Sequence, residues 1–234
     1  MTGILVVIIS LSAFAGWWLW RQGVASKPWL EVGSADDLQD GSPPTLPAAK
    51  IGLGVFLAVV ASLFGLFISA YSMRMQLSDW QPLPVSGLLW LNTGMLVLSS
   101  VALQWTKAAA HREEMDGVKL GLLAGGVSAL AFLSGQVLAW RGLSEAGYAL
   151  ASNPANSFFY LITGLHGLHV LGGLVALGRT IDKVWRAAPW DRLQLSVELC
   201  AAYWHFLLFV WLVLLALLTG WAGDFVEICR QLLS

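Results

Sequence analysis

Residues 157–173 read Ser-Phe-Phe-Tyr-Leu-Ile-Thr-Gly-Leu-His-Gly-Leu-His-Val-Leu-Gly-Gly. The apolar segment around them is long enough to cross a lipid bilayer as a helix. It nevertheless contains two histidines, His166 and His169, one helical turn apart. Because ionisable side chains inside a membrane are costly and usually serve a function, any interpretation of this chain has to explain these two residues.

The composition of the whole chain agrees with a membrane location. Of its 234 residues, 57% are hydrophobic and 12% are charged, and the mean hydropathy is +0.70. A soluble domain of this size would have too few charges to cover its surface. The 13 Lys and Arg residues are spread over short loops and the net charge is −1, so no nucleic-acid partner is expected.

Six apolar runs of roughly 20 residues each, the length that spans a hydrocarbon core, divide the chain. They cover residues 3–20, 51–73, 85–105, 120–140, 158–177 and 200–221. The sequence therefore predicts an all-α, polytopic membrane helix bundle with six transmembrane helices. We divide it into an N-terminal transmembrane helix (1–20), a polar cytoplasmic linker (21–50), a five-helix membrane domain (51–222) and a short outer tail (223–234).

The basic residues predict the orientation. Ten of the 13 Lys and Arg residues follow the first, third and fifth runs, whereas Arg74, Arg141 and Arg230 lie on the opposite side. By the positive-inside rule the first group is cytoplasmic, which places both termini on the outer, periplasmic side. Within the six runs there is no Asp, Glu, Lys or Arg, and this argues against a solute transporter.

Small residues repeat every four positions in the run 120–140, at Gly121, Gly125 and Ala129. A second set follows at Ala131, Gly135 and Ala139. Membrane helices associate through close backbone contact at small residues, because lipid provides no hydrophobic drive between them. We expect this helix to pack tightly against a neighbour.

The histidines allow two interpretations. His166 and His169 project about 60° apart and lie about 4.5 Å apart along a helix, so they cannot ligate one metal from opposite sides. His169 and His205 could lie at similar depth and bridge a haem. Alternatively, the histidines hydrogen-bond between the helices 158–177 and 200–221, with Thr163, Tyr203 or Glu198 as partners. No metal site is expected, and His111 is interpreted as a solvated residue of the loop 106–118.

Longer motifs carry a specific resemblance. Residues 158–160 (Phe-Phe-Tyr) and 163–170 (Thr-Gly-Leu-His-Gly-Leu-His-Val), then Glu198, 203–206 (Tyr-Trp-His-Phe) and Trp211, resemble subunit III of the haem-copper terminal oxidases. From residue 50 to about 221 the chain is similar to the last five helices of that family, in the same order. It looks like a shortened bacterial form of cytochrome c oxidase subunit 3. Two acidic residues common in the family are replaced here by Val60 and Leu208.

The resemblance implies a non-catalytic subunit of a respiratory complex that reduces oxygen to water and pumps protons. Its partners would be oxidase subunit I, as the main contact, subunit II and membrane lipids, in the bacterial inner membrane. Haems and copper would reside in the partner subunits, while this chain holds phospholipid and sustains proton uptake. We assign a structural polar cluster to His166, His169, Glu198, Tyr203 and His205. Lipid or interface contacts are assigned to Trp190, Arg192 and Trp204.

Two alternatives remain open at this point. The chain could be the same subunit of a quinol oxidase, or a homologue associated with nitric oxide reduction, because the electron donor is recognised by other subunits. From a different class, it could be a membrane cytochrome whose haem is bound by His169 and His205.

Overall fold

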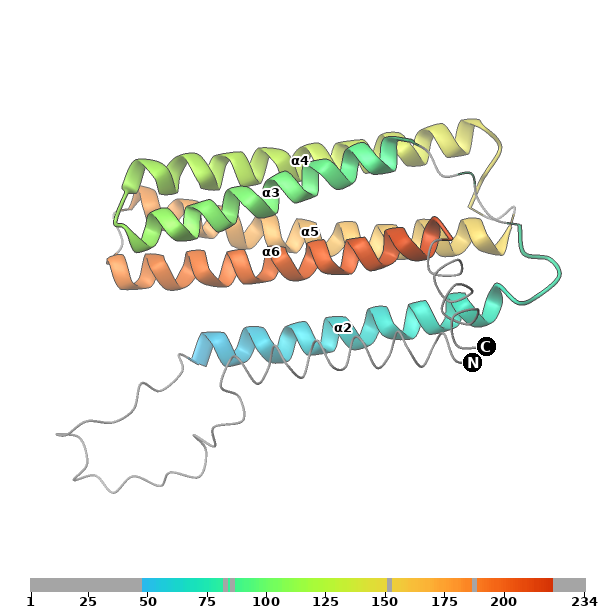
Figure 1. Cartoon of the computed structure of the whole chain (residues 1–234), viewed down its shortest axis with the longest axis horizontal. Helices are drawn as coiled ribbons and strands as arrows, with labels where there is room; N and C mark the ends of the chain where they lie inside the picture. Colours follow the sequence, from blue (N-terminus) through green and yellow to red (C-terminus); the bar gives the residue numbers. More distant parts are fainter. Residues whose placement is uncertain (1–47, 82–83, 85–86, 151–152, 187–188, 221–234) are drawn as a thin grey trace, which may run out of the picture. The chain divides into compact units, whose positions relative to one another are not determined.

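The structure, a computed structural model, describes residues 48–81, 84, 87–150, 153–186 and 189–220. These residues form five α-helices: α2 (Ala48–Arg74), α3 (Gly87–His111), α4 (Met115–Glu145), α5 (Pro154–Trp185) and α6 (Trp190–Leu218). All five are long and apolar enough to cross a membrane. The described part of the chain therefore confirms an all-helical membrane protein (Figure 1). The predicted helix 3–20, nearly all of the linker 21–50 and the tail 223–234 lie outside the described residues.

The helices extend beyond the apolar runs that predicted them. Helix α2 begins at Ala48, within the segment interpreted as linker, and α3 continues to His111. His111 is thus helical, and its assignment to a loop was wrong. The apolar run ends at Trp105, but the alanines that follow are the best helix formers, so the backbone stays helical after the hydrophobic pattern stops.

The start of α5 follows directly from the local sequence. Asn153 has an extended backbone, and its side-chain Oδ1 accepts a hydrogen bond from the backbone N–H of Ala155 at 3.0 Å. Pro154 occupies the first helical turn, where its missing N–H costs nothing. The Asn-Pro pair therefore begins the helix four residues before its apolar run.

The chain divides into two units, residues 1–65 and 66–234. Helix α2 crosses this division. Within the second unit, α3 packs on α4 and α6, and α5 packs on the same two helices. From α3 to α6, short connections make successive helices antiparallel (Figure 1). Between α3 and α4 the turn is so tight that Glu113 adopts a positive φ of 59°.

Small residues produce the contact between α3 and α4, as the sequence predicts. A Cβ atom added to Gly121 would lie 2.1 Å from Thr106 Oγ1, and one at Gly135 would lie 2.0 Å from Asn92 Oδ1. The hydroxyl of Ser99 also donates a hydrogen bond to the carbonyl oxygen of Gly125, at 2.7 Å. The two backbones approach this closely only because α4 carries glycine at these positions.

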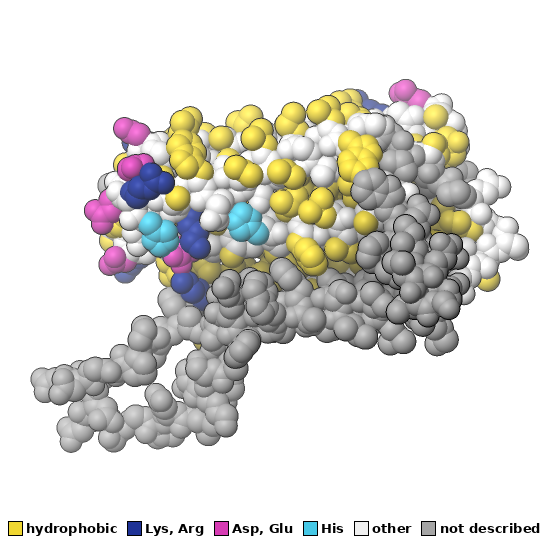
Figure 2. Space-filling model, in the orientation of Figure 1, with side chains coloured by type: hydrophobic (Ala, Val, Ile, Leu, Met, Phe, Trp, Pro, Cys, Tyr) yellow, Lys and Arg dark blue, Asp and Glu magenta, His cyan; other side chains and the backbone are white. Residues whose placement is uncertain are grey.

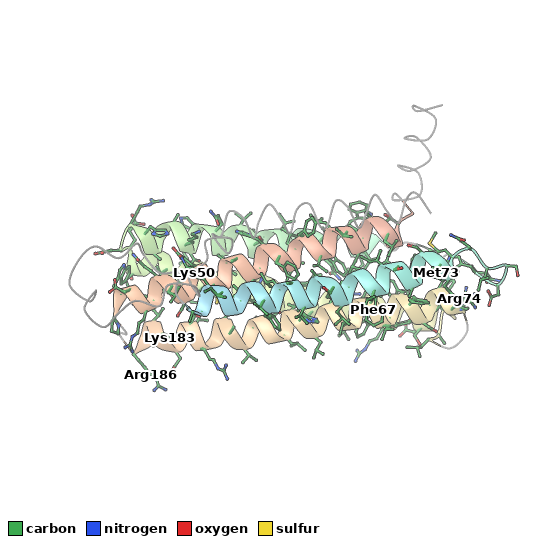
Figure 3. All side chains as sticks on the ribbon, turned by 90° about the horizontal axis from the view of Figure 1, so that it is seen from below. Lys50, Phe67, Met73, Arg74, Lys183 and Arg186 are labelled. Carbon is green, nitrogen blue, oxygen red and sulfur yellow. The ribbon has the colours of Figure 1, made fainter. Side chains whose placement is uncertain are left out.

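Basic side chains lie at both ends of the second unit. Lys183 and Arg186 lie at the end where α5 and α6 are connected, and Arg74 lies at the opposite end (Figure 3). Arg74 donates two hydrogen bonds to the carboxylate of Asp79. This ion pair anchors the turn that follows α2.

Candidate functional site

His166 lies inside the four helices of the second unit and is fully buried. Its ring centroid is 5.1 Å from that of Trp211 on α6 and 5.8 Å from that of Phe132 on α4. Phe132 and Trp211 in turn meet edge to face at 4.9 Å. The histidine is therefore one member of an aromatic core that joins α4, α5 and α6.

His169 and Tyr203 form one of the polar contacts between α5 and α6. The Tyr203 hydroxyl donates a hydrogen bond to the backbone carbonyl of His169 at 2.9 Å, while His169 Nδ1–H donates to Leu165 O, at 2.8 Å in its own helix. Next to this contact, a Cβ at Gly173 would lie 2.8 Å from both the Tyr203 and Trp204 rings. The glycine lets two aromatic side chains pack directly on the α5 backbone.

His205 connects α6 to α3, a helix that the sequence interpretation did not include. Gln104 Oε1 accepts a hydrogen bond from His205 Nε2–H at 3.0 Å, and the Ser100 hydroxyl is bonded to His205 Nδ1. In a neutral ring with its proton on Nε2, Nδ1 accepts from the serine. His205 and Gln104 are both exposed on the surface of the chain.

Glu198 also pairs with α3. Its carboxylate lies 3.3 Å from His111 Nε2, at the end where α3 stops. One turn before Glu198, Gln194 donates a hydrogen bond to the carbonyl oxygen of Ala110 at 3.0 Å. Two of the five residues assigned to one α5–α6 cluster, Glu198 and His205, thus bind α3. The apolar runs could not reveal this, because they do not indicate which helices are neighbours.

The three residues assigned to lipid or interface contacts have different surroundings. Trp190 and Arg192 lie in the first turn of α6, where Arg192 is exposed. Trp204 is completely buried against Gly173. Trp204 therefore cannot contact lipid here, and that part of the assignment is corrected: its ring packs on the α5 backbone at Gly173.

Sequence reasoning missed the polar contacts of α3. The Trp211 indole N–H donates a hydrogen bond to Thr93 Oγ1 at 2.9 Å, and both side chains are buried. Asn92 Nδ2 and Gln136 Oε1, also buried, lie 3.4 Å apart. Buried amides and hydroxyls in an apolar run do signal a helix contact, but the sequence does not identify their partners.

Hydrogen bonds within the chain use several of the histidine ring nitrogens. Both ring nitrogens of His205 are hydrogen-bonded to α3, and His169 uses Nδ1 within its own helix. Among the described residues, no group of three His, Cys, Asp or Glu side chains is close enough to bind a metal ion. A haem bound by His205 would have to replace one of its hydrogen bonds to α3.

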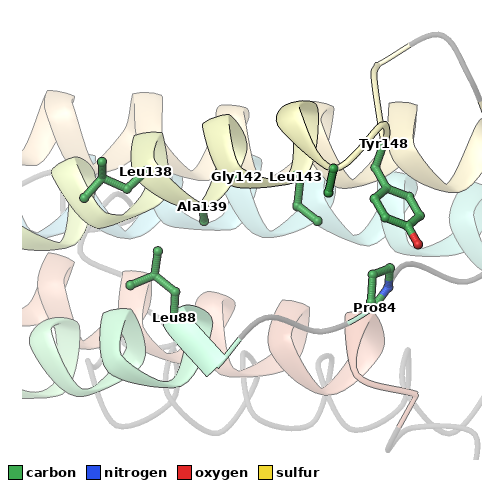
Figure 4. Close-up of a pocket in the computed structure, with 8 residues that line it drawn as sticks. Pro84, Leu88, Leu138, Ala139, Gly142, Leu143 and Tyr148 are labelled. Carbon is green, nitrogen blue, oxygen red and sulfur yellow. The ribbon is translucent and has the colours of Figure 1, made fainter.

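An apolar pocket of about 320 Å³ lies between the start of α3 and the end of α4 (Figure 4). Leu88, Leu138 and Leu143 line it, and Pro84 and Tyr148 close one side. Its size and lining suit an alkyl chain. Arg141 lies on the same end of α4 and is exposed.

Comparison with known proteins adds an independent result. Residues 46–223 match the family model of cytochrome c oxidase subunit III. This match includes every helix that the structure describes.

Individual relatives agree with the family model. The cytochrome c oxidase subunit 3 of Thermostichus vulcanus is 30% identical over 173 residues, covering 72% of this chain and 85% of the relative. A probable cytochrome c oxidase subunit 3 of Mycobacterium bovis is 31% identical over 170 residues, covering 70% and 84%. The subunit 3 of Artemia franciscana is 30% identical over 203 residues, covering 82% and 77%. The resemblance seen in the sequence motifs is confirmed, and the chain belongs to the cytochrome c oxidase subunit III family.

Proposed function

We propose that this chain is subunit III of a bacterial respiratory haem-copper oxidase and has no redox centre of its own. The observation that carries this proposal is the family match across residues 46–223. Bacterial relatives at about 30% identity bear the name cytochrome c oxidase subunit 3. The chain would sit in the bacterial inner membrane, pack on subunit I beside subunit II and sustain proton uptake during turnover.

The polar residues of the site support a structural role for this chain. Tyr203 binds the α5 backbone at His169, and His205 binds two side chains of α3. Each contact joins helices of the same chain, and His166 is enclosed by the aromatic rings of its neighbours. We infer that these side chains hold the second unit in shape, while haems and copper are in the partner subunits.

Bound lipid is part of the same proposal. The pocket between α3 and α4 is apolar and would accept one acyl chain, with the nearby Arg141 available for a phosphate. At the other end of the helices, Trp190 and Arg192 begin α6 and would lie at the level of the headgroups. Both are features that a lipid-holding subunit would use.

Removal of the chain tests the proposed role. Membranes from a strain that lacks it should keep the haem spectrum of the oxidase but lose sustained oxygen consumption with reduced cytochrome c. The complementing chain should restore this turnover. Unchanged oxygen consumption in the deletion strain would contradict the proposal, and so would a stoichiometric haem in the chain purified alone.

A further inference from the structure

We draw no further inference here: the strongest candidate, the exposed surface where α3 and α6 meet and where histidine reaches the exterior among hydrophobic side chains (Figure 2), carries none, because nothing in the described part of the chain shows what covers it.

Discussion

Replacing Gly173 with alanine should destabilise the contact between α5 and α6. The added Cβ would lie 2.8 Å from a ring atom of Tyr203 and 2.8 Å from one of Trp204, well inside van der Waals contact. Trp204 is fully buried, and Tyr203 is hydrogen-bonded to α5, so neither ring can move away freely. Overpacking of this kind costs about 1–3 kcal/mol, and the higher helix propensity of alanine recovers at most about 1 kcal/mol.

The net loss of about 1–2 kcal/mol should lower the Tm of the detergent-solubilised protein by about 4 °C. Gly172→Ala is a matched control, because a Cβ there meets no described atom within 4 Å. It should leave the Tm unchanged or raise it slightly. Equal melting temperatures for the two variants would refute the conclusion that Gly173 sets the distance between α5 and α6. Relief of the defect by a second substitution, Trp204→Phe, would support the contact directly.

Three further predictions follow from contacts in the second unit. A double-mutant cycle of Trp211→Phe and Thr93→Val should give a coupling of about 0.6–1.7 kcal/mol in SDS unfolding, because the indole N–H donates to the threonine hydroxyl; additive single effects would refute this bond. The Arg74 guanidinium, mainly through its hydrogen bonds, lowers the pKa of the Asp79 carboxyl. The ion pair should therefore stabilise the turn fully at a pH above the ordinary Asp pKa. This stabilisation should be lost as the pH falls through the lowered pKa of Asp79. Unfolding of Asp79→Asn and wild type should therefore differ at neutral pH and converge in acid; a constant difference would contradict the pairing. Gly135→Ala should weaken the α3–α4 contact, since its Cβ would lie 2.0 Å from a side-chain oxygen of α3, and an unchanged Tm would disprove this.

The helices and their tight contacts were predictable from the sequence, because both depend on local patterns. Apolar runs of membrane length located all five described helices, and the spacing of Gly121, Gly125 and Gly135 indicated the close approach of α4 to a neighbour. The residues at which the helices end were less predictable. Helix α3 continues to His111 after its hydrophobicity has ended, since helix propensity and hydropathy are different properties.

The partners of the polar residues could not be predicted. His205 and Glu198 were assigned to a polar cluster between α5 and α6, yet both bind α3. Which helices are neighbours in a bundle depends on how all of its helices pack. The sequence of one helix face does not identify the helix that it contacts. The burial of Trp204 could not be predicted either, because a tryptophan in a membrane helix can face the lipid interface or the core.

The most direct test of the proposed function is affinity purification of the tagged chain from mildly solubilised membranes. The haem spectrum and the stoichiometry of the co-purified partners are recorded on the same sample. We predict equimolar recovery with a haem-copper subunit and a copper-containing partner, and a haem content that belongs to those partners. Recovery of the chain without any oxidase subunit, or with haem that disappears in His205→Ala, would contradict its assignment as a structural subunit of the oxidase.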